Sequence, residues 1–177
     1  GYQHQSSRNC LQKNNGNGTS FSDVGLITGT FATDWSWSPL FADFDNDGNA
    51  DVIALSSMMT GMGSEMDLLL YRGNGDGTFT DVTEAAGLKK VMPKGANRIV
   101  IADLDGNGFP DIVVPGARPV VLKNAGNTNK WVRVNLRGLK VAPNVQWRSG
   151  ARTNGSGLGA TVEAWTDSTW SESEITS

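Results

Sequence analysis

The stretch LFADFDNDGNADVIAL, residues 40–55, crowds acidic side chains between two apolar runs. It holds four aspartates, namely Asp43, Asp45, Asp47 and Asp51. A related stretch, VIADLDGNGFPDIVV, follows at residues 100–114 with the same internal spacing. Carboxylates placed this close repel one another and resist folding unless something compensates their charge. Two stretches with one spacing therefore point to one shared cause.

A hard cation would remove this repulsion. Calcium takes about six to eight oxygen ligands, and alternate residues of a tight loop can point at one centre. Positions 1, 3, 5, 7 and 9 of the first loop are Asp43, Asp45, Asp47, Asn49 and Asp51, and those of the second are Asp103, Asp105, Asn107, Phe109 and Asp111. Asn49 and Phe109 are expected to contribute backbone carbonyls. The sequence thus predicts about two Ca²⁺ ions, the second bound more weakly because it has three carboxylates instead of four.

The same loop residues allow three interpretations other than a calcium loop between strands. A helix–loop–helix calcium site needs an acidic side chain at position 12, where this chain has Ala54 and Val114 inside β-like runs, so we reject it. A metal-free turn rich in Asp and Asn stays open. Catalysis by paired acids is less favoured, because the acids form two equivalent sets.

Glycine-broken turns alternate with the aspartate loops. They are LQKNNGNGTSFSDV (11–24), LYRGNGDGTFTDV (70–82) and VLKNAGNTNKW (121–131). Between them lie short β-like runs, at 51–55, 67–71, 98–104, 111–114, 119–123 and 131–136, while 81–92 reads as a short helical turn. A unit of about four short strands that recurs along the chain predicts an all-β fold of propeller-type blades. We expect about three blades of antiparallel strands; a sandwich is the main competitor.

Composition excludes several classes of protein. The net charge is −3, but without the seven loop aspartates 15 basic residues face 11 acidic ones, which gives +4. This balance, without clustered Lys and Arg, argues against a nucleic-acid surface, and no apolar run of about 18 residues indicates a membrane span. The chain has one cysteine, Cys10, and one histidine, His4. This argues against a catalytic site in which a histidine activates a nucleophile, so we expect that the protein is not an enzyme.

These motifs resemble a known family. The aspartate loops and the NGDGTF turn resemble the FG-GAP/VCBS repeat of integrin-like β-propellers. FADFDNDGNADV, YRGNGDGTFTDVTEAAGL, and NTNKWVRVNLRGL with GLGATVEAW are similar to the ASPIC/UnbV (cartilage acidic protein-like) family. The resemblance implies a calcium-stabilised propeller on secreted or surface proteins. It divides the chain into a repeat region (1–130), the start of an ASPIC/UnbV-like β segment (131–165) and a polar, disordered tail (166–177).

About three blades are fewer than the roughly seven that usually close such a propeller, so we expect a blade set that is incomplete or completed by other chains. Open strand edges favour partners that are other proteins or copies of this chain. The expected role is a non-enzymatic, secreted, calcium-binding protein of adhesion, matrix, or surface and filament assembly. A lectin-like module that stacks glycans on Trp35 and Trp37, or a fragment of a propeller enzyme, stays open. Asn17 and Asn154 stand in glycosylation sequons.

Overall fold

The computed structural model describes residues 8–33, 35–57, 66–89, 91, 95–134, 161–165 and 170–174. The chain separates into two compact units, Gly1–Lys130 and Trp131–Ser177. Apart from one short helix, the regular structure of the described residues is β strand. The prediction of an all-β fold of antiparallel strands is therefore confirmed. The helix is four residues long, and no helix of the described residues is long and apolar enough to cross a membrane.

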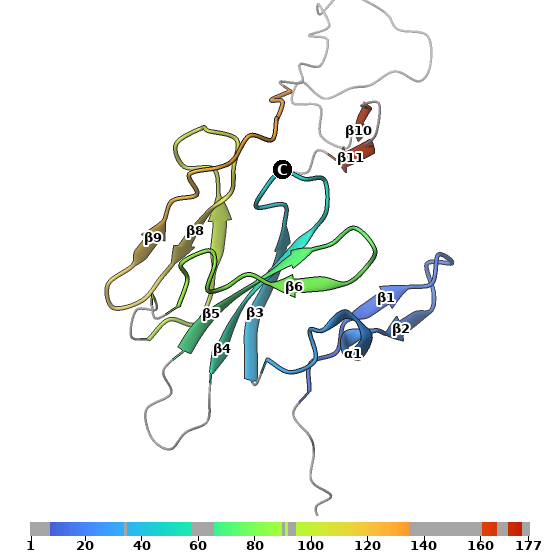
Figure 1. The fold of residues 1–177 in the computed structure, drawn as a ribbon, viewed down its shortest axis with the longest axis horizontal. Coiled ribbons are helices and arrows are strands. Elements are labelled where there is room, and N and C mark those ends of the chain that lie inside the picture. Colours follow the sequence, from blue (N-terminus) through green and yellow to red (C-terminus); the bar gives the residue numbers. More distant parts are fainter. Residues whose placement is uncertain are drawn as a thin grey trace, which may run out of the picture. The chain divides into compact units, whose positions relative to one another are not determined.

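The described residues of the first unit form three sheets of consecutive antiparallel strands (Figure 1). Blade 1 has four strands, β3 (Trp35–Ala42), β4 (Asp51–Ser57), β5 (Met66–Gly73) and β6 (Phe79–Asp81). Blade 2 has three, β7 (Val100–Ala102), β8 (Asp111–Val114) and β9 (Val120–Leu122). The third sheet is the hairpin of β1 (Gln12–Asn14) and β2 (Phe21–Asp23). Sheets in which strand order follows sequence order are what propeller blades require.

The hydrophobic core lies between blade 1 and blade 2. Ile53, Leu55 and Leu68 are fully buried in the first sheet, and Val114 is 1% exposed in the second. Cross-strand partners share a face, and Leu55 pairs with Leu68 in register. Burial of each such side chain contributes about 1.5–3 kcal/mol, so this core stabilises both blades.

A short helix that the sequence analysis did not predict follows β2. Helix α1 spans Gly25–Thr28 and ends at Gly29, which has a φ of +82°. Asp23 Oδ1 accepts a hydrogen bond from the Gly25 N–H at 3.1 Å, and the Thr28 N–H donates to the Val24 carbonyl at 3.0 Å. This arrangement folds the chain back after the hairpin.

The same device recurs after β6. Asp81 Oδ1 accepts from the Thr83 N–H at 2.9 Å, and the Ala86 N–H donates to the Val82 carbonyl at 2.8 Å. Gly87 has a φ of +72°. The predicted helical turn in 81–92 is thus one hydrogen-bonded turn that starts after a strand. In the first two turn motifs, the repeat therefore extends past the Asp-Val pair that ends the motif.

Two expectations for the second unit differ from the structure. Residues 131–134 form no strand, although a β run was predicted for 131–136. Within the expected disordered tail, β11 (Trp170–Glu174) pairs antiparallel with β10 (Thr161–Trp165), so that expectation is wrong for β11. Backbone pairing satisfies the N–H and C=O groups of β11 that face β10, whatever its side chains are. The Arg133 guanidinium lies 5.5 Å from the centre of the Trp131 ring.

Candidate metal centres

The first aspartate loop connects β3 to β4 and gathers three carboxylates. One oxygen each of Asp43, Asp45 and Asp47 lies within 4.8 Å of the others. Backbone N–H groups hold them: Asp43 accepts from Asp47 at 3.1 Å and from Gly48 at 2.9 Å. Asp47 in turn accepts from the Asn49 N–H at 2.8 Å. The loop therefore presents its acids from a fixed backbone.

The second loop connects β7 to β8 and repeats this bonding. Asp103 accepts from the Gly106 N–H at 2.8 Å and from the Gly108 N–H at 3.1 Å. Gly108 has a φ of +88° and Gly48, sixty residues earlier, a φ of +89°. Such a φ strains any residue with a Cβ. Here the three clustered acids are Asp103, Asp105 and Asp111.

The aspartates at position 9 carry a role that sequence reasoning missed. Asp51 is 2% exposed, and its two oxygens accept the N–H groups of Phe44 at 2.8 Å and Gly73 at 2.9 Å. It thereby fastens its own loop to the end of β5. Asp51 is not among the three clustered acids of its loop, so its assignment as a ligand stays a prediction.

Asp111 repeats this arrangement in the second loop. Fully buried, it accepts the N–H groups of Leu104 at 2.9 Å and Asn124 at 2.7 Å. Unlike Asp51, it also belongs to the acid cluster of its loop. Asp51 and Asp111 are the first residues of the buried strands β4 and β8. An acidic residue directly before an apolar run is the sequence feature that could have indicated this fastening role.

The two loops differ in electrostatics. Burial raises the pKa of Asp45, and the neighbouring carboxylates of Asp47 and Asp43 raise it further. Burial also raises the pKa of Asp51, against the two N–H bonds that lower it. In the second loop the Asn124 and Leu104 N–H groups, helped by Lys123, lower the pKa of Asp111. Burial and the neighbouring carboxylates thus act against ionisation of Asp45 and Asp51, although the Arg72 side chain lowers the pKa of Asp45 in part.

A lysine compensates part of the charge in the second loop. Lys123 Nζ lies 3.2 Å from Asp105 Oδ2. Since Lys123 is exposed, this pair contributes little to stability by itself. The first loop also has a cation nearby, because Arg72 lowers the pKa of Asp45. The weaker calcium binding expected of the second loop therefore stays a prediction.

The residues fit a hard divalent cation. Each carboxylate oxygen has lone pairs beyond the one that accepts an N–H bond, so the loops keep ligand capacity. Asn107 uses both ends of its amide, because Oδ1 accepts from the Phe109 N–H at 2.9 Å and Nδ2 donates to the Asn124 carbonyl at 2.9 Å. The ligand roles of Asn107 and of the Asn49 and Phe109 carbonyls stay predictions. Position 12 of each loop, Ala54 and Val114, lies inside a strand.

Comparison with known proteins gives the family. A family model described as an FG-GAP-like repeat matches residues 3–54 and 59–114, which is more than half of the chain. The chain belongs to the FG-GAP-like repeat family. No curated protein and no solved structure matches it. The first matched segment ends inside β4 and the second at the last residue of β8, each after an aspartate loop. The FG-GAP-like repeats, together with the antiparallel sheets, confirm propeller-type blades.

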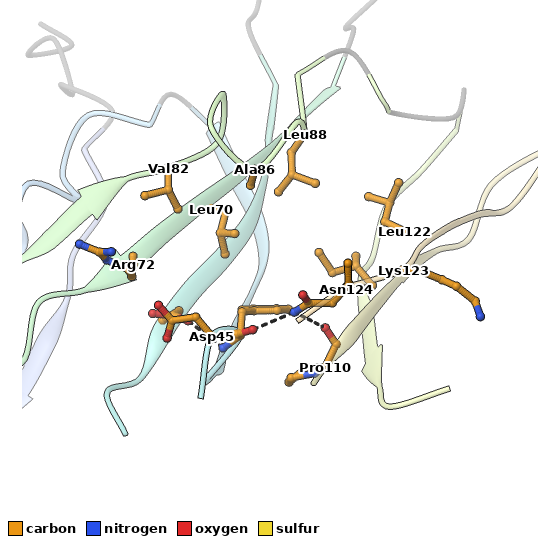
Figure 2. Close-up of a pocket in the computed structure, with 14 residues that line it drawn as sticks. Asp45, Leu70, Arg72, Val82, Ala86, Leu88, Pro110, Leu122, Lys123 and Asn124 are labelled. Carbon is orange, nitrogen blue, oxygen red and sulfur yellow. Dashed lines mark hydrogen bonds between the residues drawn. The ribbon is translucent and has the colours of Figure 1, made fainter. Parts of the chain in front are cut away.

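Residues of blade 1, of blade 2 and of the segment after β6 line an open cavity of about 440 Å³. Leu70, Val82 and Leu88 face it from one side and Leu122 from the other (Figure 2). Asp45 and Arg72 stand at its edge in the same view. The cavity is therefore mainly apolar and borders the first loop.

The remaining residues named in the sequence analysis do not belong to the two aspartate loops. Trp37 is 50% exposed on β3, and nothing is described of the Trp35 side chain. Asn17 is exposed in the turn between β1 and β2, where its Oδ1 accepts the N–H groups of Thr19 and Ser20. Asn154 and His4 lie outside the described residues. Cys10 is an exposed free thiol.

Proposed function

We propose that this chain is a calcium-binding, non-enzymatic repeat module that acts outside the cell in adhesion, matrix, or surface and filament assembly. The observation that carries the proposal is the convergence of three carboxylates in each of two loops, in phase with two FG-GAP-like repeats. Such repeats are typical of extracellular proteins and often bind calcium. A bound ion would supply the positive charge that these loops lack.

The role of calcium in this proposal is structural. Asp43 and Asp103 already bind backbone N–H groups on the far side of their loops. An ion held by their remaining lone pairs would fix the turn between β3 and β4, and that between β7 and β8. Because both turns adjoin the interface between blades, the ions would stabilise the packing of the whole repeat region.

An exposed apolar face of blade 2 supports the proposal of a protein partner. Val100, Val113 and Val121 are cross-strand neighbours on one face, and Val100 and Val121 are 45% and 51% exposed. Phe44 and Leu104 occupy position 2 of their loops. Phe44 is buried in the core, with 7% of its surface exposed, whereas Leu104 is 51% exposed. The face that is covered in blade 1 is thus open in blade 2.

The edge of β9 offers a second contact. Among the described residues β9 pairs only with β8, whereas the equivalent β5 pairs on both sides. A free edge can accept a strand from another chain. We therefore infer that the partner is a further blade, from another protein or from a copy of this one.

The closer family assignment is also part of the proposal. Residues 131–165 would begin an ASPIC/UnbV-like segment after a repeat region that spans 1–130. In its support, Thr161–Trp165 of the GLGATVEAW motif forms β10 and pairs with β11. The proposed tail, 166–177, then contributes that second strand.

A lectin-like module is the second candidate, and the exposure of Trp37 favours it. Half-exposed indole rings can stack on sugars, because they offer an apolar face beside a polar N–H. The test is binding to a glycan array by the wild type and by Trp37→Ala. Loss of a specific glycan signal in the variant would support this candidate, and no binding by the wild type would end it.

Calcium titration of the full chain tests the main proposal. Isothermal calorimetry should find about two ions for the wild type, and Asp45→Ala and Asp105→Ala should each remove one. Asp76→Ala is the matched control, because Asp76 lies in an exposed turn outside both loops and bonds to Thr78. Unchanged stoichiometry in both loop variants would overturn the assignment.

A further inference from the structure

The side chain of Asn124, which follows β9, bonds to both aspartate loops. Its Nδ2 donates to the Phe44 carbonyl in the first loop at 2.8 Å and to the Pro110 carbonyl in the second at 3.2 Å (Figure 2). Its backbone N–H donates to Asp111 Oδ1 at 2.7 Å, and its carbonyl accepts from Asn107 Nδ2 at 2.9 Å. One residue thus touches the main chain of one loop and two candidate ligands of the other.

Three more asparagines bond to the backbone of these loops through their side-chain amides. Asn127 and Asn129 donate from Nδ2 to the Asp45 carbonyl at 2.7 and 2.8 Å. In the opposite direction, Asn46 donates from Nδ2 to the Gly108 carbonyl at 3.1 Å. We refer to Asn46, Asn124, Asn127 and Asn129 as the asparagine clip. The side-chain amides of the clip donate to backbone carbonyls of the loops and not to their carboxylates.

The first repeat shows that the side chain of Asn124 is not needed to fasten the strand. Gly73 takes its place there, and its N–H donates to Asp51 as that of Asn124 does to Asp111. A Cβ on Gly73 would stand 2.4 Å from the Ala50 carbonyl oxygen. The amide of Asn124 is therefore an addition in the second repeat, and it reaches the loop of the first.

We propose that the asparagine clip couples the two loops, so that a calcium ion in one orders the other. The inference rests on the proposed calcium binding. An ion in the second loop would fix Asp111 and Asn107, which hold Asn124 in place. Asn124 then fixes the Phe44 carbonyl, whose neighbours Asp43 and Asp45 are ligands of the first loop. Such coupling acts equally in both directions.

A double-mutant cycle on the full chain tests the coupling. Asp105→Ala removes the ion of the second loop, and calorimetry with calcium then measures the affinity of the first. Asp105→Ala should weaken the first site by about 5-fold or more in the wild-type background. In an Asn124→Ala background the same change should weaken it by less than about 2-fold, because the clip no longer transmits it. Asn74→Ala is the control, since Asn74 bonds to Thr78 and Thr80 within its own turn.

A second measurement does not depend on the affinity of the first site. In Asp45→Ala the carbonyl of residue 45 remains, so the clip stays while the first loop loses its ion. Calcium added to this variant should slow the hydrogen exchange of the Gly48 amide by about 5-fold or more. The double variant Asp45→Ala/Asn46→Gly keeps Asn124 but loses the bond from Asn46 to the Gly108 carbonyl, so it should show a smaller slowing; glycine suits the φ of +53° at residue 46. This keeps the test decisive even where Asn124→Ala does not fold.

The outcomes separate the two proposals. Equal weakening of the first site with and without the clip overturns the coupling and leaves calcium binding intact. So does a wild type with two ions and no effect of Asp105→Ala on the first site. No calcium binding by the wild type overturns both. Clip-dependent weakening together with slower Gly48 exchange supports the coupling.

Discussion

The carboxylate of Asp51 accepts a hydrogen bond from the backbone N–H of Gly73 at 2.9 Å, across 22 residues of sequence. Its other oxygen accepts the Phe44 N–H at 2.8 Å. One buried side chain thus joins the start of β4, the end of β5 and the aspartate loop. Both donors lose their water on folding, so without the carboxylate each would be buried unpaired.

Asp51→Ala should destabilise the protein by about 2–6 kcal/mol, since each buried donor left without a partner costs about 1–3 kcal/mol. Urea unfolding measured by circular dichroism gives this free energy. The measurement is made in EDTA, so that lost calcium binding does not contribute. Asp76→Ala, in an exposed turn, should cost less than about 1 kcal/mol. Equal costs for the two variants would show that Asp51 does not hold the strands.

Gly126→Ala should cost more than Gly77→Ala. Both glycines have positive φ, +72° and +89°, so each substitution adds backbone strain of about 1–2 kcal/mol. A Cβ on Gly126 would also stand 2.6 Å from the ring of Phe109, whereas one on Gly77 meets nothing within 4 Å. The clash should add about 1–3 kcal/mol. Unfolding free energies that agree within error would contradict the packing of Phe109 on this turn.

Phe44→Ala and Leu104→Ala compare one loop position in two blades. Phe44 is 7% exposed in the core, and its loss should cost about 3–5 kcal/mol. Leu104 is 51% exposed, so its truncation should cost less than about 1 kcal/mol in the isolated chain. A cost for Leu104→Ala as large as that for Phe44→Ala would mean that blade 2 is already covered in solution.

The turn between β5 and β6 should depend on pH through Asp76. The hydroxyl and the N–H of Thr78, which bond to Asp76 Oδ1 at 2.6 and 2.8 Å, lower the pKa of Asp76 below 3.8. A lowered folded pKa gives stability above the unfolded value that is lost as pH falls through the folded value. NMR titration of the Asp76 carboxyl should show this pKa, and Thr78→Val should raise it towards 3.8. No change in Thr78→Val would assign the shift to another cause.

Regular spacing made the loops and most strands of the first unit predictable. Each loop position recurs sixty residues later, and Gly48 and Gly108 have nearly the same φ. Short Val- and Leu-rich runs indicate strands because of their length, their β-branched residues and the turn residues that flank them. The loops and these strands were thus predictable because neighbouring residues determine them.

Contacts between blades were not predictable in this way. Asn124 lies 80 residues from Phe44, and nothing in the sequence around either residue indicates that they meet. The fastening role of Asp51 likewise depends on where β5 ends. β11 was missed because its composition is polar, while its pairing with β10 uses the backbone alone. The exposed face of blade 2 depends on what covers blade 1, which only the packing reveals.

Thermal unfolding with and without calcium tests the central claim most directly. Ligand at about 100 times its dissociation constant stabilises a folded chain by about 2.7 kcal/mol per site. Each kcal/mol raises the Tm of a chain of this length by about 2–4 °C. Two structural sites therefore predict a Tm at least about 10 °C lower in EDTA than in saturating calcium, restored when calcium is added back. Melting curves that superimpose in EDTA and in calcium would contradict the account.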